Sequence, residues 1–168
     1  MFGSFHLLER IFTMTFSSDI KEFAEKTKKD IADVKKYAAI TIFTDIVKAT
    51  PVGNPDYWQE VNGKPRKAPP GYTGGRLRGN WQTSLNTPIH TEIARIERDP
   101  EGGDVLKQAH SIVNNSSVEE SIFLTNNLPY AIRVEYGHSK KQRPMGMLRV
   151  SIAGFENAIK EALRKVKQ

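Results

Sequence analysis

The sequence predicts an α+β fold made of a long N-terminal helix, an extended arm rich in proline and glycine, a small antiparallel sheet and a C-terminal helix. Apolar residues recur at three- and four-residue steps over ~30 residues before Pro51 and over ~20 residues at the C-terminal end, as in amphipathic helices. Between these regions, turn-forming residues separate short apolar runs, which is typical of strands. A chain of 168 residues has the size of one domain.

The first helix is expected to begin at residues 17–19 and to end near Ala49. Residues 17–19 read Ser-Ser-Asp, which favours an N-cap, and the Thr50-Pro51 pair stops a helix. The apolar face consists of Ile20, Phe23, Ala24, Thr27, Ile31, Val34, Ala38, Thr41 and Ile42. A helix of this length measures ~45 Å, which is more than one small domain covers. Two interpretations stay open: a scaffold helix, or a helix that packs partly on another subunit.

Residues 1–13 are predicted to be an extension in front of a single domain that covers residues 14–168. His6, Glu9 and Arg10 interrupt the apolar run that a secretion signal needs, and Met14 begins a more typical N-terminal sequence. We expect this extension to be flexible or to contact a neighbouring molecule. No segment approaches the ~20 apolar residues that span a bilayer, so no membrane partner is expected.

Residues 50–80 are predicted to form the extended arm. Five prolines and six glycines in this window exclude a continuous helix or strand. Long loops without secondary structure are uncommon and tend to be functional or disordered. Tyr57, Trp58 and Tyr72 argue against disorder, because aromatic side chains seek burial or a partner surface. We therefore expect the arm to become ordered on contact with a partner.

The remaining elements are shorter. Residues 76–85 are expected to form a turn or short helix that buries Trp81, and residues 99–104 to form a turn. Strands are predicted at residues 89–98 and 121–127, while residues 105–113 fit a helix or a strand equally well. The last helix is predicted from Met147 to the C-terminus, with one apolar face made of Leu148, Ile152, Phe155, Ile159, Ala162, Leu163 and Val166.

Residue patterns for catalysis or for cofactor and metal binding are weak. The chain has no cysteine, and its four histidines are isolated, so neither a metal nor a cofactor is expected. A triad of Ser139, His138 and Glu135 is adjacent in sequence, which is not the geometry that a triad requires. Glu135 beside Arg133 is more typical of an ion pair or an interface contact. The sequence therefore predicts a protein that is not an enzyme, with a hydrolase using His138 or Glu135 as the minor alternative.

The net charge of +6 and the pI near 9.5 favour contact with polyanions. Lysine and arginine are scattered along the chain, which predicts weak, non-specific contact with nucleic acid rather than sequence reading. Lys140, Lys141 and Arg143, in the basic segment HSKKQRP, are the residues expected to face DNA. A non-specific nucleic-acid-binding module is accordingly the alternative functional interpretation.

Four segments together resemble a known family: TPV at 50–52, GYTGGRLRGNWQ at 71–82, NNLPYAIRVEYGHS at 126–139 and PMGMLRV at 144–150. They are similar in order and spacing to the tail-completion, or neck, proteins of long-tailed bacteriophages, which are related to the head–tail joining proteins of lambdoid phages. The family pattern has Gln-Ala-Pro-Gln-Gly-Met where this chain has KKQRPMGM, so the contacts of that loop are a point of departure.

The resemblance implies a structural protein of the virion, made in the host cytoplasm and located in the phage neck. Its expected partners are identical copies in a ring of about six subunits, the head connector or stopper proteins, the tail tube proteins, and DNA in the lumen. Completion and terminator roles both stay open. The candidate interface residues are Gly75, Arg76, Leu77, Arg78, Asn127, Pro129, Tyr130, Glu135, Tyr136, Gly137 and Met147, together with the aromatic residues of the arm.

Overall fold

The computed structural model describes residues 5–54, 67, 70, 73–94, 99–137 and 146–166, with side chains from Ser18 onward. The elements, in order, are α1 (Phe5–Ala49), the 3-10 helix η2 (Arg78–Asn80), β1 (Gln82–Leu85), α2 (Gly103–Asn114), β2 (Ile122–Thr125), α3 (Ala131–Glu135), α4 (Leu148–Ala153) and α5 (Phe155–Val166). A long N-terminal helix, a two-stranded antiparallel sheet and a C-terminal helix confirm the predicted α+β class.

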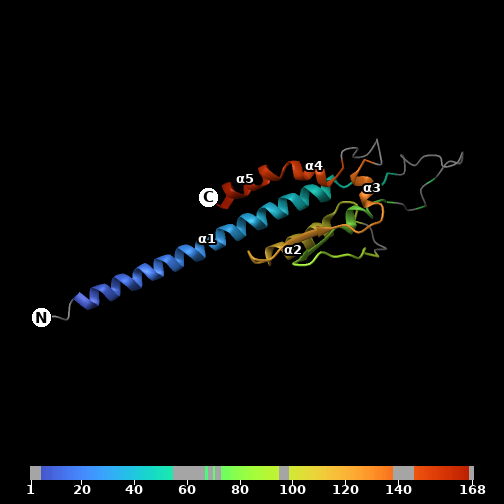
Figure 1. Ribbon diagram of the computed structural model, residues 1–168. Helices are drawn as coiled ribbons and strands as arrows, with labels where there is room; N and C mark the ends of the chain where they lie inside the picture. Colours follow the sequence, from blue (N-terminus) through green and yellow to red (C-terminus); the bar gives the residue numbers. More distant parts are fainter. Residues whose placement is uncertain are drawn as a thin grey trace.

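Helix α1 is a long rod whose N-terminal half projects away from the remaining elements (Figure 1). Its C-terminal half lies between α5 on one side and α2 with the sheet on the other. The helix begins at Phe5, so residues 17–19 lie inside it and the predicted start there is wrong. N-cap preference amounts to only ~1 kcal/mol, and residues such as Leu, Glu, Arg and Met on the N-terminal side favour continuation of the helix. Residues 5–13, predicted to be an extension, are part of α1, which has no break at Met14.

The C-terminal end of α1 lies where the sequence predicts it, and side chains from the next segment stabilise it. The Thr50 N–H donates to the carbonyl oxygens of Ile46 and Val47. The guanidinium of Arg78 donates to the carbonyl oxygen of Thr50 at 2.7 Å and to that of Lys48 at 3.2 Å. A cation at this position satisfies helix carbonyl groups that have no partner within the helix.

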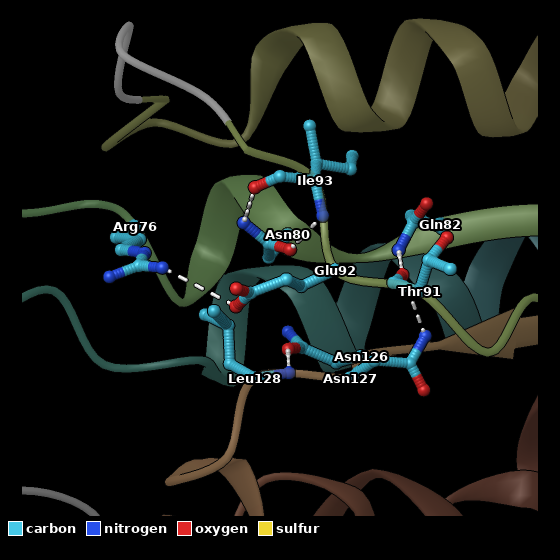
Figure 2. Close-up of polar contacts among 9 residues, drawn as sticks. All are labelled: Arg76, Asn80, Gln82, Thr91, Glu92, Ile93, Asn126, Asn127 and Leu128. Atoms are coloured by element: carbon cyan, nitrogen blue, oxygen red, sulfur yellow. Dashed lines mark hydrogen bonds and ion pairs between the residues drawn. The ribbon is translucent and has the colours of Figure 1, made fainter.

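The sheet pairs β1 with β2 in antiparallel register, from Gln82 opposite Thr125 to Leu85 opposite Ile122. The predicted strand at 121–127 is confirmed. The predicted strand at 89–98 is wrong for residues 89–94, which form no ladder, and residues 95–98 lie outside the described residues. The Asn80 amide instead donates to the Ile93 carbonyl oxygen and accepts from the Ile93 N–H, at 3.1 and 2.8 Å (Figure 2). A side chain therefore satisfies the backbone groups that a neighbouring strand would otherwise pair.

Helix α2 resolves the ambiguity at residues 105–113 in favour of a helix. The Asp99 carboxylate accepts hydrogen bonds from the N–H groups of Gly103, Asp104 and Val105 at 3.0 to 3.2 Å, so the predicted turn at 99–104 also caps the helix. Val105, Ala109 and Val113 lie on the buried face of α2. The Lys35 ammonium of α1 donates to the carbonyl oxygens of Ser117, Val118 and Glu120, which holds the connection after α2 against α1.

The predicted C-terminal helix is present in two parts. Helix α4 ends at Ala153, Gly154 follows, and α5 begins at Phe155, with Ala158 and Ala162 buried against α1. The hydrophobic core lies around the C-terminal half of α1 and includes Ile42, Phe43, Val47, Leu77, Trp81, Val105, Val113, Leu128 and Met147. Within the described residues, no helix combines the length and the apolar character that crossing a membrane requires.

Candidate functional site

The four segments that carry the family resemblance meet at the end of the molecule where α1 stops. Pro51, Gly75 and Tyr130, one from each of three segments, line a single hollow of about 220 Å³. The Asn126 amide donates to the Leu77 carbonyl oxygen at 2.8 Å, which joins the second segment to the third. The third and fourth segments are joined through Glu135. The sequence motifs are therefore parts of one connected structure.

Glu135 ends α3 and binds the first residues of α4. Its carboxylate accepts hydrogen bonds from the N–H groups of Met147 at 2.7 Å, Leu148 at 2.8 Å and Arg149 at 3.1 Å. The Arg149 guanidinium lies 3.3 Å from the same carboxylate and donates to the Glu135 carbonyl oxygen at 2.6 Å. The ion-pair partner of Glu135 is therefore Arg149, whereas the sequence suggested Arg133.

The hydrogen bonds to Glu135 determine its ionisation. Burial on its own raises the pKa of this carboxyl group, but the N–H groups of Leu148, Met147 and Arg149 and the Arg149 side chain outweigh burial. The pKa therefore lies below the usual glutamate value, and the group is a carboxylate at neutral pH. Because its oxygen atoms are already engaged by several donors, Glu135 is a structural anchor and a poor general base.

Gly146 fits closely against Glu135. Its φ of +87° lies in the left-handed region, and a Cβ atom would lie 2.7 Å from the Glu135 Oε1 atom. The Gly-Met pair of the fourth segment thus has a physical explanation: glycine allows the close approach, and Met147, which is 1% exposed, fills the core.

The outer surface of α3 is apolar and uncovered by the described residues. Ile132 is 71% exposed and Tyr136 is 74% exposed. Both border a hollow of about 390 Å³, here called the α3 hollow, whose other lining residues include Trp81, Leu124 and Leu148. The Arg149 guanidinium lies over the Tyr136 ring, 5.1 Å from its centroid, which holds this aromatic side chain at the rim.

Polar contacts also join the second and third segments to Thr91 and Glu92 (Figure 2). Arg76 lies 3.3 Å from the Glu92 carboxylate, with both side chains exposed. In the third segment, the Asn127 amide donates to the carbonyl oxygens of Ile89 and Thr91 at 2.9 and 3.1 Å. Figure 2 draws the contact with Thr91. These contacts attach residues 89–92 to the site.

The predicted interface and DNA-facing residues fall into four groups. Gly75, Leu77, Glu135 and Met147 are buried in the chain itself, and Arg78 and Asn127 hold its backbone, so the structure gives these six an intramolecular role. Gly137 follows the C-cap residue of α3 and has a φ of +81°. Arg76, Pro129, Tyr130 and Tyr136 are exposed and stay candidates for contact with a partner. Tyr57, Trp58, Tyr72, Lys140, Lys141 and Arg143 lie outside the described residues.

The structure adds two surfaces that the motif analysis missed. One is the exposed side chain of Ile132. A helix as short as α3 shows no clear apolar periodicity, so the sequence does not reveal which of its residues are exposed. The other is a groove of about 480 Å³ between α1 and α2, here called the basic groove, lined by Thr44, Lys48, Leu106, Lys107 and His110. Its cations are far apart in sequence and meet only through helix packing.

Metal binding finds no support in the part of the chain that the structure describes, where no three His, Asp or Glu residues are grouped as metal ligands. In comparisons with models of protein families, with curated proteins and with solved structures, nothing matches this chain.

Proposed function

We propose that this protein is a structural component of the neck of a tailed-phage virion. Copies of the chain form a ring, with six subunits as the expected number, that completes the tail and joins it to the connector of the head. DNA passes through the lumen and makes only weak, non-specific contacts with it. The protein is made in the host cytoplasm, has no enzymatic activity and needs no cofactor.

The uncovered apolar surface of the folded chain is the observation on which the proposal rests. Phe23 on α1 is 72% exposed, and Ile20 and Ile31 on the same helix are also exposed. Ile132 and Tyr136 expose a second apolar surface on α3. Contiguous exposed apolar surface on a folded protein marks an interaction site, and copies of one chain can cover such surfaces mutually in a closed assembly.

The arrangement of the four sequence motifs gives independent support. Most of their residues hold the protomer together where α1 ends, through the contacts of Arg78, Asn126 and Glu135. A family that shares these motifs would share this local scaffold, while the exposed residues around it are free to vary with the partner. The hydrolase interpretation loses support, because the Glu135 carboxylate is engaged by backbone N–H groups.

The test of the proposed function is the assembly state of the intact chain. Sedimentation velocity and electron microscopy of the purified protein should show a closed ring instead of a single chain of 19.0 kDa. In phage particles, an electron-microscopy map should place the chain between head and tail. A chain that stays monomeric at high concentration and is missing from particles would contradict the proposal.

A non-specific nucleic-acid-binding module is the second candidate, and the basic groove favours it. Lys48, Lys107 and His110 line the groove, and none of its lining residues is acidic. Lysine side chains bind phosphates as point charges, without reading sequence. This function is compatible with a ring, since a lumen crossed by DNA would present such a surface.

A further inference from the structure

The apolar face of α1 continues beyond the helix that covers it. Helix α5 packs along α1, and a hollow lined by Thr27, Ile31, Leu163 and Val166 marks the end of that contact. Toward the N-terminus the same face continues with Phe23 and Ile20, both exposed. We call residues 20–27 the rod tip, because they are the first apolar part of α1 with described side chains, although the helix itself continues to Phe5. Its spacing of three and four residues matches the covered part of the helix, so the rod tip is a continuation of a packing surface.

The internal connections of the same chain are too short to span the distance to Phe23 and back. Asn54 and Thr73 lie near the C-terminal end of α1, where Gly74 packs against Gly53, and this end is ~40 Å from Phe23 at the helical rise. A fully extended connection between Asn54 and Thr73, out and back, reaches ~30 Å. Residues 138–145 also begin and end beside α3 and are shorter. The rod tip is therefore available to another molecule.

The α3 hollow has the size and chemistry to receive an aromatic side chain. Its volume of about 390 Å³ falls within the ~300–1,000 Å³ of pockets that hold compact ligands. Ile132 and Tyr136 stand at its rim, while Trp81, Leu124 and Leu148 supply further apolar walls. A phenylalanine buries ~150–250 Å² on entering such a site.

The charges beside the two surfaces are mixed, and one acid and one base among them are complementary. Asp19 lies one turn from Phe23 on α1, and Arg133 follows Ile132 on α3; both are exposed. Neither has an ion-pair partner among the residues that the structure describes. An acid beside the rod tip and a base beside the hollow would pair when the two surfaces meet.

We propose that the rod tip of one copy inserts Phe23 into the α3 hollow of the next copy. This inference rests on the proposed function and names the contact that forms the ring. Pro51 and Tyr130 line one hollow, which places α3 beside the C-terminal end of α1, ~40 Å along the helix from Phe23, so the two surfaces cannot meet within one copy. Such a contact is head-to-tail, and head-to-tail contacts close into rings when the rotation between neighbours permits.

Two single variants and their mixture test the proposal. Phe23→Asp removes the rod tip and keeps the hollow, whereas Ile132→Asp blocks the hollow and keeps the rod tip. Each variant alone should be a folded monomer by circular dichroism and sedimentation. An equimolar mixture should form dimers and stop there, because exactly one intact contact is possible per pair. Phe155→Asp, a matched change at another exposed phenylalanine, should leave the wild-type assembly unchanged.

Each outcome tests either the proposed contact or the proposed ring. Two monomeric variants that stay monomeric when mixed would overturn the head-to-tail contact in favour of a symmetric one. Variants that assemble like the wild-type chain would overturn it and leave the proposed function standing. If only Ile132→Asp still assembles, the hollow has another occupant, such as residues 138–145, and the inference fails. A monomeric wild-type chain would instead refute the proposed function itself.

Engineered cysteines add a direct measurement, because the natural chain has none. The double variant Phe23→Cys with Ile132→Cys should give a ladder of covalent oligomers under mild oxidation. Phe23→Cys alone should give no covalent dimer, since a disulfide needs Cα atoms within ~7 Å and the two rod tips do not meet. Covalent dimers from Phe23→Cys alone, without a ladder from the double variant, would overturn the contact.

Discussion

The indole N–H of Trp81 donates a hydrogen bond of 2.7 Å to the hydroxyl of Thr50, and both residues are buried. Thr50 Oγ1 in turn donates to the Ile46 carbonyl oxygen at 2.8 Å. This pair links the end of α1 to the beginning of the sheet. This hydrogen bond gives a physical reason for the threonine before Pro51 and the tryptophan after η2.

Thr50→Val should lower the free energy of unfolding by ~1–3 kcal/mol, because the buried indole N–H loses its acceptor while the shape of the site is kept. Urea unfolding followed by tryptophan fluorescence measures the change. Thr44→Val is the matched control: its hydroxyl donates only to the Ile40 carbonyl oxygen and accepts from no described side chain, so it should cost ~0.5 kcal/mol or less. Equal effects of the two substitutions would show that the indole contact contributes nothing.

Gly146→Ala should destabilise the protein by ~1–3 kcal/mol or more. The backbone at this residue has a φ of +87°, and the added Cβ atom would meet the carbonyl oxygen and carboxylate of Glu135. Gly103→Ala is the control, because that glycine begins α2 with open space around it. There, alanine should be neutral or stabilising by up to ~1 kcal/mol. A neutral Gly146→Ala variant would contradict the close approach described above.

Glu135→Gln should lower the free energy of unfolding at neutral pH. It should also make that free energy less dependent on pH in the acidic range. The pKa of Glu135 lies below the usual value, so its carboxylate stabilises the fold above the unfolded-state pKa, ~4.3, and this contribution is lost as the pH falls through the lower folded-state pKa. At pH 7 the substitution should cost ~1–3 kcal/mol, since N–H groups of α4 lose a charged acceptor.

Chemical unfolding of the wild-type chain and Glu135→Gln between pH 2 and pH 7 provides the measurement. Glu119 and Glu120 also have lowered pKa values, through the Lys28 ammonium and the Ser117 N–H respectively, so the wild-type profile contains their contributions too. The difference between the two profiles isolates Glu135. It should be largest at neutral pH and shrink in acid; a difference that is constant with pH would refute the charged role.

Local patterns predicted the helices well and the site only in part. The C-terminal helix was predicted, but its buried face was predicted only in part: Ala162 is buried as expected, Ile152, Phe155 and Leu163 are exposed, and the buried Ala158 lay outside the predicted face. The break at Gly154 depends on packing. Gln82 and Thr83 are buried polar residues of β1, so their strand carries no apolar alternation to detect. The predicted apolar face of α1 is uncovered at Ile20, Phe23 and Ile31 among the described residues.

The sequence predicts the site only in part, because the contacts that form the site join residues far apart in the sequence. Glu135 binds α4 across a connection that the sequence marks only as basic, and the resemblance assigned it to an interface although it is buried. Arg78 reaches back to the end of α1, which no spacing rule anticipates. The sequence identifies the four motifs, but the physical role of each residue in them depends on the fold.

Removal of the two lysines of the basic groove should weaken duplex DNA binding and reduce its salt dependence. Lys48→Ala with Lys107→Ala deletes the lysine charges of a groove whose lining has no carboxylate. Each lost phosphate contact lowers the slope of log K against log salt by ~0.9, so the double variant should lose a slope of ~1–2. Fluorescence anisotropy with a short duplex, measured between low and physiological salt, gives both quantities.

Lys29→Ala with Lys160→Ala is the control, since it makes the same change in net charge at exposed positions outside both the groove and the rod tip. If binding depended only on net charge, both double variants would weaken it equally through long-range attraction. Direct contact with phosphates in the groove predicts a larger change in slope for Lys48 and Lys107, because only bound counterions displaced at the contact contribute to it. Identical slopes for the two double variants would therefore reject the groove as a DNA-binding surface, while leaving the apolar contacts between copies untouched.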